Sequence, residues 1–223
     1  MSAHSPIPWG EDPVDASITS AMMSDSLDRA GARHQVSELR LWADSRPLRA
    51  SGIARTIRFV PDPDLDPPHP YDDMMDFIDA VTPGEFIVLA TGESISSAFW
   101  GELFSAAAMG RGGTGMATDG NIRDVEKIRA LHFPVFARGH RPIDYRGRMK
   151  VDAVQVDVTL GGVSVSPGDL IMGDEDGLVV VPQQLMDTVV EYSRERARGE
   201  STVLTELLAG STLREVWTRH GIL

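Results

Sequence analysis

Three charged side chains near the middle of the chain are spaced so that they could do chemistry together. Glu102 is followed by twenty residues and then by the adjacent pair Arg123 and Asp124. An arginine fork matches the geometry of a substrate carboxylate, and carboxylate oxygens are ligands that hard divalent cations prefer. The group could therefore bind an anionic substrate and a metal ion side by side.

Each of these residues also has an ordinary structural interpretation. Asp124 could be a helix N-cap, Arg123 a solvated charge, and Glu102 a carboxylate favoured by a helix dipole. The functional interpretation gains weight because the Arg123–Asp124 pair follows a predicted strand and an Asp119-Gly120 turn, where ligand sites of α/β sheets tend to lie.

Six glycines in the same stretch raise the question of phosphate binding. Their spacing includes Gly110-x-Gly112-x-x-Gly115, which matches a dinucleotide-binding loop. Such a loop follows a strand and opens a helix, whereas this cluster follows the helix-prone residues 102–109 and leads into a predicted strand. The pattern favours a helix end and a turn.

Composition argues against several other classes of site. The chain has no cysteine, which removes thiolate metal sites and cysteine nucleophiles. Its six histidines, His4 and His34 among them, lack the close spacing of zinc ligands. The net charge of −12 argues against a nucleic-acid surface, and Asp174 to Gly177 is typical of a hairpin turn rather than a calcium loop.

The expected location is the cytoplasm, with no membrane partner. No segment approaches the roughly 18 apolar residues that span a bilayer. Residues 1–12 lack both the basic and the apolar regions of a signal peptide.

The helices and strands expected around these residues indicate one layered α/β domain over residues 1–223, with a β-rich core and helical ends. Apolar periodicity predicts helices at residues 15–30, 72–81, 102–109, from 124, 183–198 and 212–219. It predicts strands at residues 52–60, 86–90, 114–118, 134–137, 151–158, 163–165, 170–172 and 178–181. A proline-rich loop is expected at residues 61–70.

Several motifs, in this order, resemble the RraA-like family, which includes class II pyruvate aldolases. They are Ser24–Leu27, Gly101-Glu102, Asp119-Gly120, Arg123-Asp124, Phe133–Gly139, Gly161–Asp169 and Gly173–Pro182. The resemblance covers roughly residues 16–200 and leaves residues 201–223 as a helical tail. Family aldolases cleave 4-hydroxy-4-methyl-2-oxoglutarate and 4-carboxy-4-hydroxy-2-oxoadipate.

The resemblance implies an α-β-β-α sandwich related to swivelling domains. It also implies homotrimers or homohexamers with sites between subunits, and a small 2-oxo acid substrate with a second carboxylate. Mg²⁺, Mn²⁺ or another divalent cation would be the cofactor, and oxaloacetate decarboxylation an expected companion activity.

The same resemblance assigns catalytic roles. Asp124 would bind the metal, Glu102 would hold a metal-bound water, and Arg123 would bind the pyruvyl group and steady the enolate. A Lewis-acid cation suits this chemistry because it stabilises the enolate charge. No Schiff-base lysine is then required.

Three further positions complete the implied site. Gly101 precedes the acidic residue, and the backbone amides of Leu103 and Phe104 would meet the substrate carboxylate. Glu200 would support the metal waters from a neighbouring subunit.

Two departures and three alternatives remain open. The aldolases usually carry aspartate where this chain has Glu102, and some members carry an acidic residue where this chain has Lys127. The family's namesake inhibits ribonuclease E and has glycine at the position of Glu102, so a non-catalytic regulator is the main alternative. Another 2-oxo or 2-hydroxy acid lyase is the second, and a phosphohistidine domain using His132 is the third.

Overall fold

The computed structural model describes residues 14–33, 35–36, 39–41 and 49–222. In chain order its elements are α1 (Ser20–Arg29), β1 (Gln35–Val36), β2 (Arg40–Leu41), β3 (Ala50–Pro61), α2 (Asp72–Asp79), β4 (Glu85–Ala90), β5 (Ala98–Trp100), α3 (Glu102–Gly110), β6 (Gly115–Ile122), α4 (Val125–Leu131), β7 (Val135–His140), β8 (Met149–Val154), β9 (Val158–Leu160), β10 (Val163–Val165), β11 (Leu170–Asp174), β12 (Gly177–Val181), the short 3₁₀ helix η1 (Gln183–Leu185), α5 (Met186–Leu208) and α6 (Leu213–His220).

The described strands form one ten-stranded mixed sheet and a separate ribbon of β9 and β10. The order along the sheet is β1-β12-β11-β3-β4-β6-β7-β2, with β8 beside β3 and β5 beside β6. Strands β3, β4, β6 and β7 run parallel, whereas β11 and β12 form an antiparallel hairpin whose turn lies at Asp174–Gly177, as predicted. The parallel strands place their carboxyl ends at one edge, where the loops that follow them meet.

The sheet bends over itself, so that its two halves enclose an apolar layer. Ile171 and Val180 of the β11–β12 hairpin pack in one cluster with Val88 and Phe136 of the parallel half. Gly173 permits this approach, because a Cβ at that position would lie 2.6 Å from the Phe136 ring.

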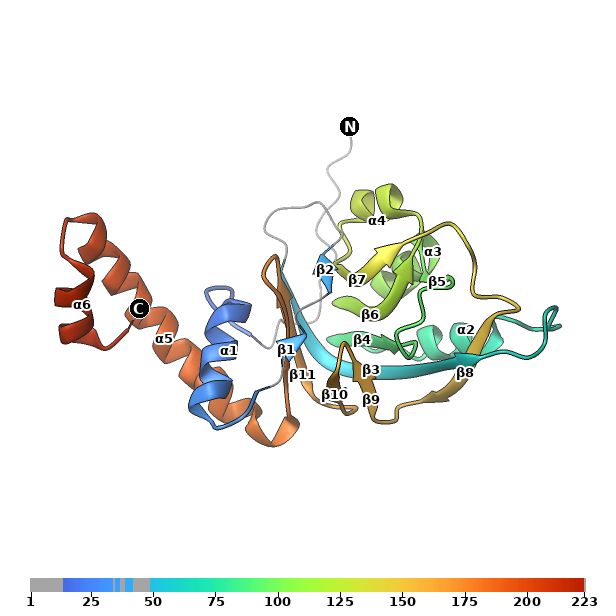
Figure 1. The fold of residues 1–223 in the computed structure, drawn as a ribbon, viewed down its shortest axis with the longest axis horizontal. Helices are drawn as coiled ribbons and strands as arrows, with labels where there is room; N and C mark the ends of the chain where they lie inside the picture. The colour runs from blue at the N-terminus through green and yellow to red at the C-terminus, as the bar shows by residue number, and fades with distance from the viewer. Residues whose placement is uncertain (1–13, 34, 37–38, 42–48, 223) are drawn as a thin grey trace.

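Helices cover both outer faces of this bent sheet (Figure 1). Helices α2, α3 and α4 pack on the parallel half through buried side chains such as Phe77 and Ile128. Helices α1 and α5 pack on the β11–β12 hairpin, where Leu27 and Val189 meet the outward-facing Met172. The result is the α-β-β-α sandwich that the family resemblance implied.

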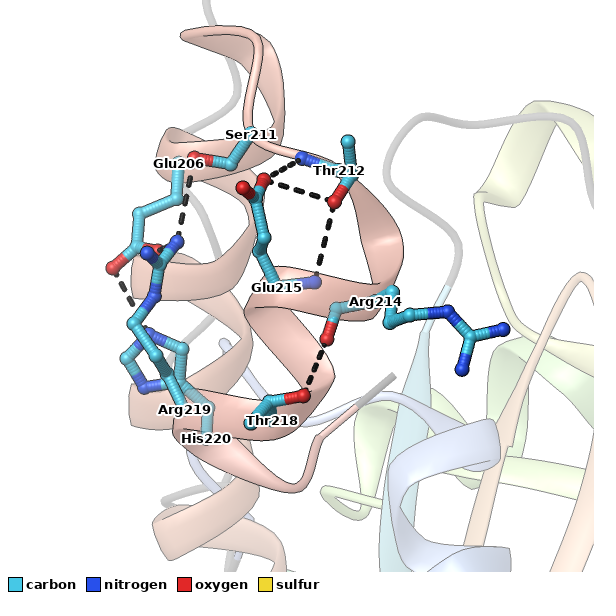
Figure 2. A network of polar contacts seen from close by, with 8 residues as sticks. All are labelled: Glu206, Ser211, Thr212, Arg214, Glu215, Thr218, Arg219 and His220. Carbon is cyan, nitrogen blue, oxygen red and sulfur yellow. Dashed lines mark hydrogen bonds and ion pairs between the residues drawn. The ribbon is translucent and has the colours of Figure 1, made fainter.

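The C-terminal helices form a hairpin beyond the sheet (Figure 1). The side chain of Thr212 accepts from the amide of Glu215, whose carboxylate accepts in return, which is a capping box. Figure 2 shows Arg219 and His220 converging on Glu206. Nη2 of Arg219 lies 2.5 Å from Oε2 of Glu206, and Nε2 of His220 lies 2.9 Å from Oε1. The hydrogen bond from His220, and then the charge of Arg219, lower the pKa of Glu206.

The boundaries of two predicted helices were wrong. Helix α1 begins at Ser20 rather than at residue 15, because Asp15 accepts from the amide of Ser17 and Thr19 caps the helix. Helix α5 continues past residue 198 to Leu208. A single glycine there is tolerated because it costs only about 1 kcal/mol in a helix.

The prediction of a turn at Asp119-Gly120 was also wrong. Both residues lie inside the buried strand β6, which runs on to Ile122. The Asp119 carboxylate accepts from the backbone amides of Thr91 and Glu93, so it anchors the loop after β4. The predicted strand 151–158 is likewise divided between β8 and β9.

No helix within the described residues is both long enough and apolar enough to cross a membrane. The interpretation of residues 1–12, and two of the histidines, His4 and His34, fall outside the described residues.

Candidate active site

The Arg123–Asp124 pair lies where three parallel strands end. Strand β5 pairs with β6 and leads into Gly101 and helix α3, while β6 leads directly into Arg123. Strand β7 pairs with β6 on its other side. Because these strands end at one edge of the sheet, side chains far apart in sequence converge there.

The guanidinium of Arg123 is held in place from two sides. The backbone amide of Arg123 donates to the carbonyl of Trp100 at 2.9 Å, and this hydrogen bond ties the ends of β5 and β6 together. Its Nη1 lies 2.7 Å from the carboxylate of Asp144, and its Nε lies 3.9 Å from that of Asp124. The side chain is 39% exposed, so part of it remains available to a ligand.

Asp124 occupies the N-cap position of helix α4 but does not cap it. Its backbone is left-handed, with φ of 58° and ψ of 37°, and its side chain makes no capping hydrogen bond. A non-glycine residue in this region is uncommon and costs free energy, which is frequent at functional sites. The strained backbone directs the carboxylate back toward the amide of Glu102, at 3.4 Å.

Gly101 is the residue that makes this arrangement possible. A Cβ at that position would lie 2.8 Å from Oδ2 of Asp124 and 3.2 Å from Cγ of Arg123. Its φ of −160° is ordinary extended backbone, so the requirement for glycine is one of space, not of conformation.

The N-terminus of helix α3 also faces this site. Gly101 has no side chain to cap the helix, and the early amides of a helix have no partner within it. Leu103 and Phe104, in that first turn, line the same hollow as Arg123. A helix N-terminus of this kind attracts anions through its amides and its dipole.

Glu102 lies beside the site, but its carboxylate is engaged by Lys127. The two side chains are 2.9 Å apart, and Glu102 is 33% exposed. The hydrogen bond to Glu102, followed by its charge, raises the pKa of Lys127. Both residues depart from the family pattern, and the sequence did not predict that they would pair.

Sequence reasoning missed several side chains at this site. Tyr71, Asp144 and Tyr145 line the same hollow, whose volume is about 260 Å³. The hydroxyl of Tyr71 lies 3.1 Å from Asp144, and burial with that hydrogen bond raises the pKa of Tyr71. Asp144 could have been suspected because it follows β7, the next parallel strand after β6.

Glu200 lies on a different part of the chain. It belongs to helix α5 and pairs with Arg196 one turn earlier, at 2.7 Å. Helix α5 packs on the β11–β12 side of the sandwich, whereas α3 and α4 cover the other side (Figure 1). A role for Glu200 in the site of a neighbouring subunit stays a prediction.

The donors present fit a hard cation that keeps most of its water. Asp124 offers one carboxylate that is 40% exposed, and Gly101 leaves room against it. Within the described residues, no three acidic, histidine or cysteine side chains cluster as metal ligands. Mg²⁺ commonly binds in this way, through one or two carboxylates and several waters.

Comparison with known proteins gives the family context. A family model described as RraA-like (Aldolase/RraA) matches residues 20–180. A Legionella pneumophila protein named DlpA is 29% identical over 88% of the chain, but the chain spans only 31% of it. A Halalkalibacterium halodurans protein named "Putative 4-hydroxy-4-methyl-2-oxoglutarate aldolase" is 33% identical, covering 52% of this chain and 54% of that protein. The chain thus spans less than two thirds of both relatives.

Two solved structures share the fold over most of both chains. An uncharacterized protein from Pseudomonas syringae pv. tomato superposes with a TM-score of 0.79 at 29% identity, covering 89% of this chain and 92% of that one. A Streptomyces coelicolor protein, RraAS2, is described as an unusual member of the RNase ES inhibitor RraA protein family. It has a TM-score of 0.73 at 27% identity, covering 83% of this chain and 90% of that one.

Proposed function

The chain belongs to the RraA-like family, and we propose that it is a lyase that cleaves a 4-hydroxy-2-oxo acid to pyruvate with a divalent cation. One observation carries the proposal. The Arg123 guanidinium, the Asp124 carboxylate and the N-terminus of α3 meet at a single hollow. The aldolase name of the Halalkalibacterium halodurans relative supports a lyase.

The reaction requires that negative charge be stabilised next to a carboxylate. The C4 hydroxyl loses its proton to a base, and the bond between C3 and C4 breaks. Its electron pair forms the enolate of pyruvate, C4 becomes an aldehyde or ketone, and C3 then takes up a proton. Atoms and electrons balance without an oxidant or a reductant.

Each part of the site matches one requirement of this reaction. The amides of Leu103 and Phe104 would bind the substrate carboxylate at the helix N-terminus. Arg123 would donate to the 2-oxo oxygen, where charge develops, and Asp144 at 2.7 Å holds its guanidinium in position. Donors fixed in advance in this way need little reorganisation during the reaction.

The cation would be held by Asp124, with Glu102 and a neighbouring subunit's copy of Glu200 near its waters. When bound it would supply Lewis-acid stabilisation of the enolate oxygen, as Mg²⁺ or Mn²⁺ can. The same enolate forms when oxaloacetate loses CO₂, so decarboxylation is the expected companion activity. A homotrimer or homohexamer would bring Glu200 to the site.

Pyruvate release, coupled to lactate dehydrogenase, tests the proposal. Oxaloacetate and a set of 4-hydroxy-2-oxo acids would be assayed with Mg²⁺, with Mn²⁺ and after chelation. We expect cation-dependent release that is lost in Asp124→Ala and kept in the control Asp187→Ala, an exposed aspartate on α5. If no substrate shows cation-dependent turnover and wild type matches Asp124→Ala, the chain is not this lyase.

A regulator of a ribonuclease is the alternative, favoured by the likeness to RraAS2. Binding to an RNase E-type enzyme, together with inhibition of its cleavage, would support it. Inhibition that persists in Asp124→Ala, without any lyase activity of the wild type, would favour the regulator over the enzyme.

A further inference from the structure

The hollow beyond Arg123 is largely apolar. Tyr71, just before helix α2, and Met75 of that helix line one side. Leu103 and Phe104 of helix α3 also line it. Tyr145 closes the wall, where its ring stacks on Phe99 at 6.0 Å between centroids. A substrate bound by its carboxylate at α3 would extend its C4 substituent along these side chains.

The charge around this wall disfavours a second carboxylate. Among the described residues that line the hollow, Arg123 is the one cation, while Asp124 and Asp144 are both anions. Arg123 is already 2.7 Å from Asp144 and is needed for the 2-oxo oxygen in the proposed reaction. A carboxylate on C4 would find no second cationic side chain among the described lining residues and would approach Asp144, which is repulsive.

The two tyrosine hydroxyls at this wall add no positive charge, because both tyrosines have a raised pKa and stay neutral. The hydroxyl of Tyr71 contacts Asp144. The hydroxyl of Tyr145 is buried and has no hydrogen-bond partner among the described residues. Burial raises the pKa of Tyr145, so its hydroxyl stays neutral and can donate.

We infer that the site takes 4-hydroxy-2-oxo acids whose C4 substituent is an uncharged alkyl or aryl group. This inference rests on the proposed lyase function and adds the substrate class to it. It departs from the second carboxylate that the family resemblance implied. The products would be pyruvate and an apolar aldehyde or ketone.

A neighbouring hollow offers the competing placement for the C4 substituent. It shares Arg123 and Asp124 and is also lined by Lys127 and Arg141. Lys127 is engaged by Glu102, and Arg141 donates to the carbonyl of Ile95. Leu103 and Phe104 do not line it, so we place the substituent in the hollow that these two residues do line.

A matched pair of substrates tests the inference. The C4 substituent of 4-hydroxy-2-oxohexanoate is ethyl, and that of 4-hydroxy-2-oxoglutarate is a carboxylate of similar size. We expect kcat/KM to favour the ethyl compound by about tenfold, because no second cationic side chain of the described residues lines the hollow for the carboxylate. Equal values, or a preference for the dicarboxylate, would overturn the inference.

The two substrates differ in intrinsic reactivity. Comparing the ratio of their kcat/KM values between variants and wild type cancels that difference. Met75→Lys places a cation on the wall, at a residue that is 48% exposed. It should shift the ratio of the two kcat/KM values about threefold toward the dicarboxylate. Val154→Lys, which adds the same charge on β8 outside this hollow, should leave the ratio unchanged. If Arg141→Gln weakens dicarboxylate cleavage while Met75→Lys shifts nothing, the substituent binds in the other hollow and the inference is wrong.

Exchange of the pyruvate methyl protons with D₂O tests the proposed lyase function independently of the proposed substrate class. This exchange, followed by NMR, needs only the pyruvyl half of the site and no C4 substituent. Cation-dependent exchange together with a dicarboxylate preference would refute the substrate class alone. If neither exchange nor cleavage of any substrate occurs, the proposed function fails as well.

Discussion

Replacing Gly101 by alanine should lower activity while leaving the fold intact. The new Cβ would lie 2.8 Å from Oδ2 of Asp124, whereas ordinary contacts begin at 3.4 Å. To regain an ordinary contact, the carboxylate must move by about 0.6 Å from its place beside Arg123. Because a misplacement of about 1 Å can cost roughly 100-fold in rate, we expect kcat/KM to fall about 10- to 100-fold.

Stability should change little, because two opposing effects act at this residue. Alanine lowers the conformational entropy of the unfolded chain, which stabilises by about 0.4–1 kcal/mol where the backbone is compatible. The φ of −160° at Gly101 meets that condition. Alanine is a poorer N-cap than glycine, which destabilises α3 by a similar amount.

The assay would compare kcat/KM and the Mg²⁺ dependence of pyruvate release with the midpoint of urea unfolding. Gly110→Ala is the matched control, because nothing lies within 4 Å of a Cβ placed there. It should keep full activity. If Gly101→Ala keeps the activity and the cation dependence of wild type, the Asp124 carboxylate does not work from the position described.

Three further predictions concern charge. Asp124→Asn should abolish cation-dependent pyruvate proton exchange, measured by NMR, with an unchanged circular dichroism spectrum. Lys127→Met should tighten Mg²⁺ binding about two- to fivefold in titrations of that exchange, because it removes a cation 2.9 Å from the Glu102 carboxylate; weaker binding would contradict this. Because the pKa of Glu206 is lowered from 4.5 in the folded chain, its ionised carboxylate stabilises the α5–α6 hairpin above about pH 4.5. That stabilisation is lost as the pH falls through the pKa of Glu206 in the folded chain. Hydrogen exchange in α6 should therefore rise on acidification below about pH 4.5, and less so in Glu206→Gln.

Local patterns were enough to predict most elements of the fold. The β-rich apolar runs at residues 170–172 and 178–181 predicted strands. Because successive side chains face opposite sides of a strand, Ile171 and Met172 lie in different cores. The Asp119-Gly120 prediction was wrong because the same two residues suit a turn and a buried anchor equally well. Only the packing of Thr91 against Asp119 distinguishes the two.

The candidate site was predictable in part. The types and spacing of Glu102, Arg123 and Asp124 indicated a shared site, and the structure brings them to one edge of the sheet. The pairing of Arg123 with Asp144 was not predictable. It depends on the loop after β7 lying beside the end of β6, and no periodicity within a short window encodes that neighbourhood.

The sequence by itself determined the residue types, the order of elements and the family motifs, because these depend on chain-local chemistry. The tertiary structure decided which charges meet. It set the left-handed backbone of Asp124, the engagement of Glu102 by Lys127, and the apolar wall around Tyr145. These features depend on strand register and side-chain packing between residues far apart in the chain, so they exist only when the whole sheet has formed.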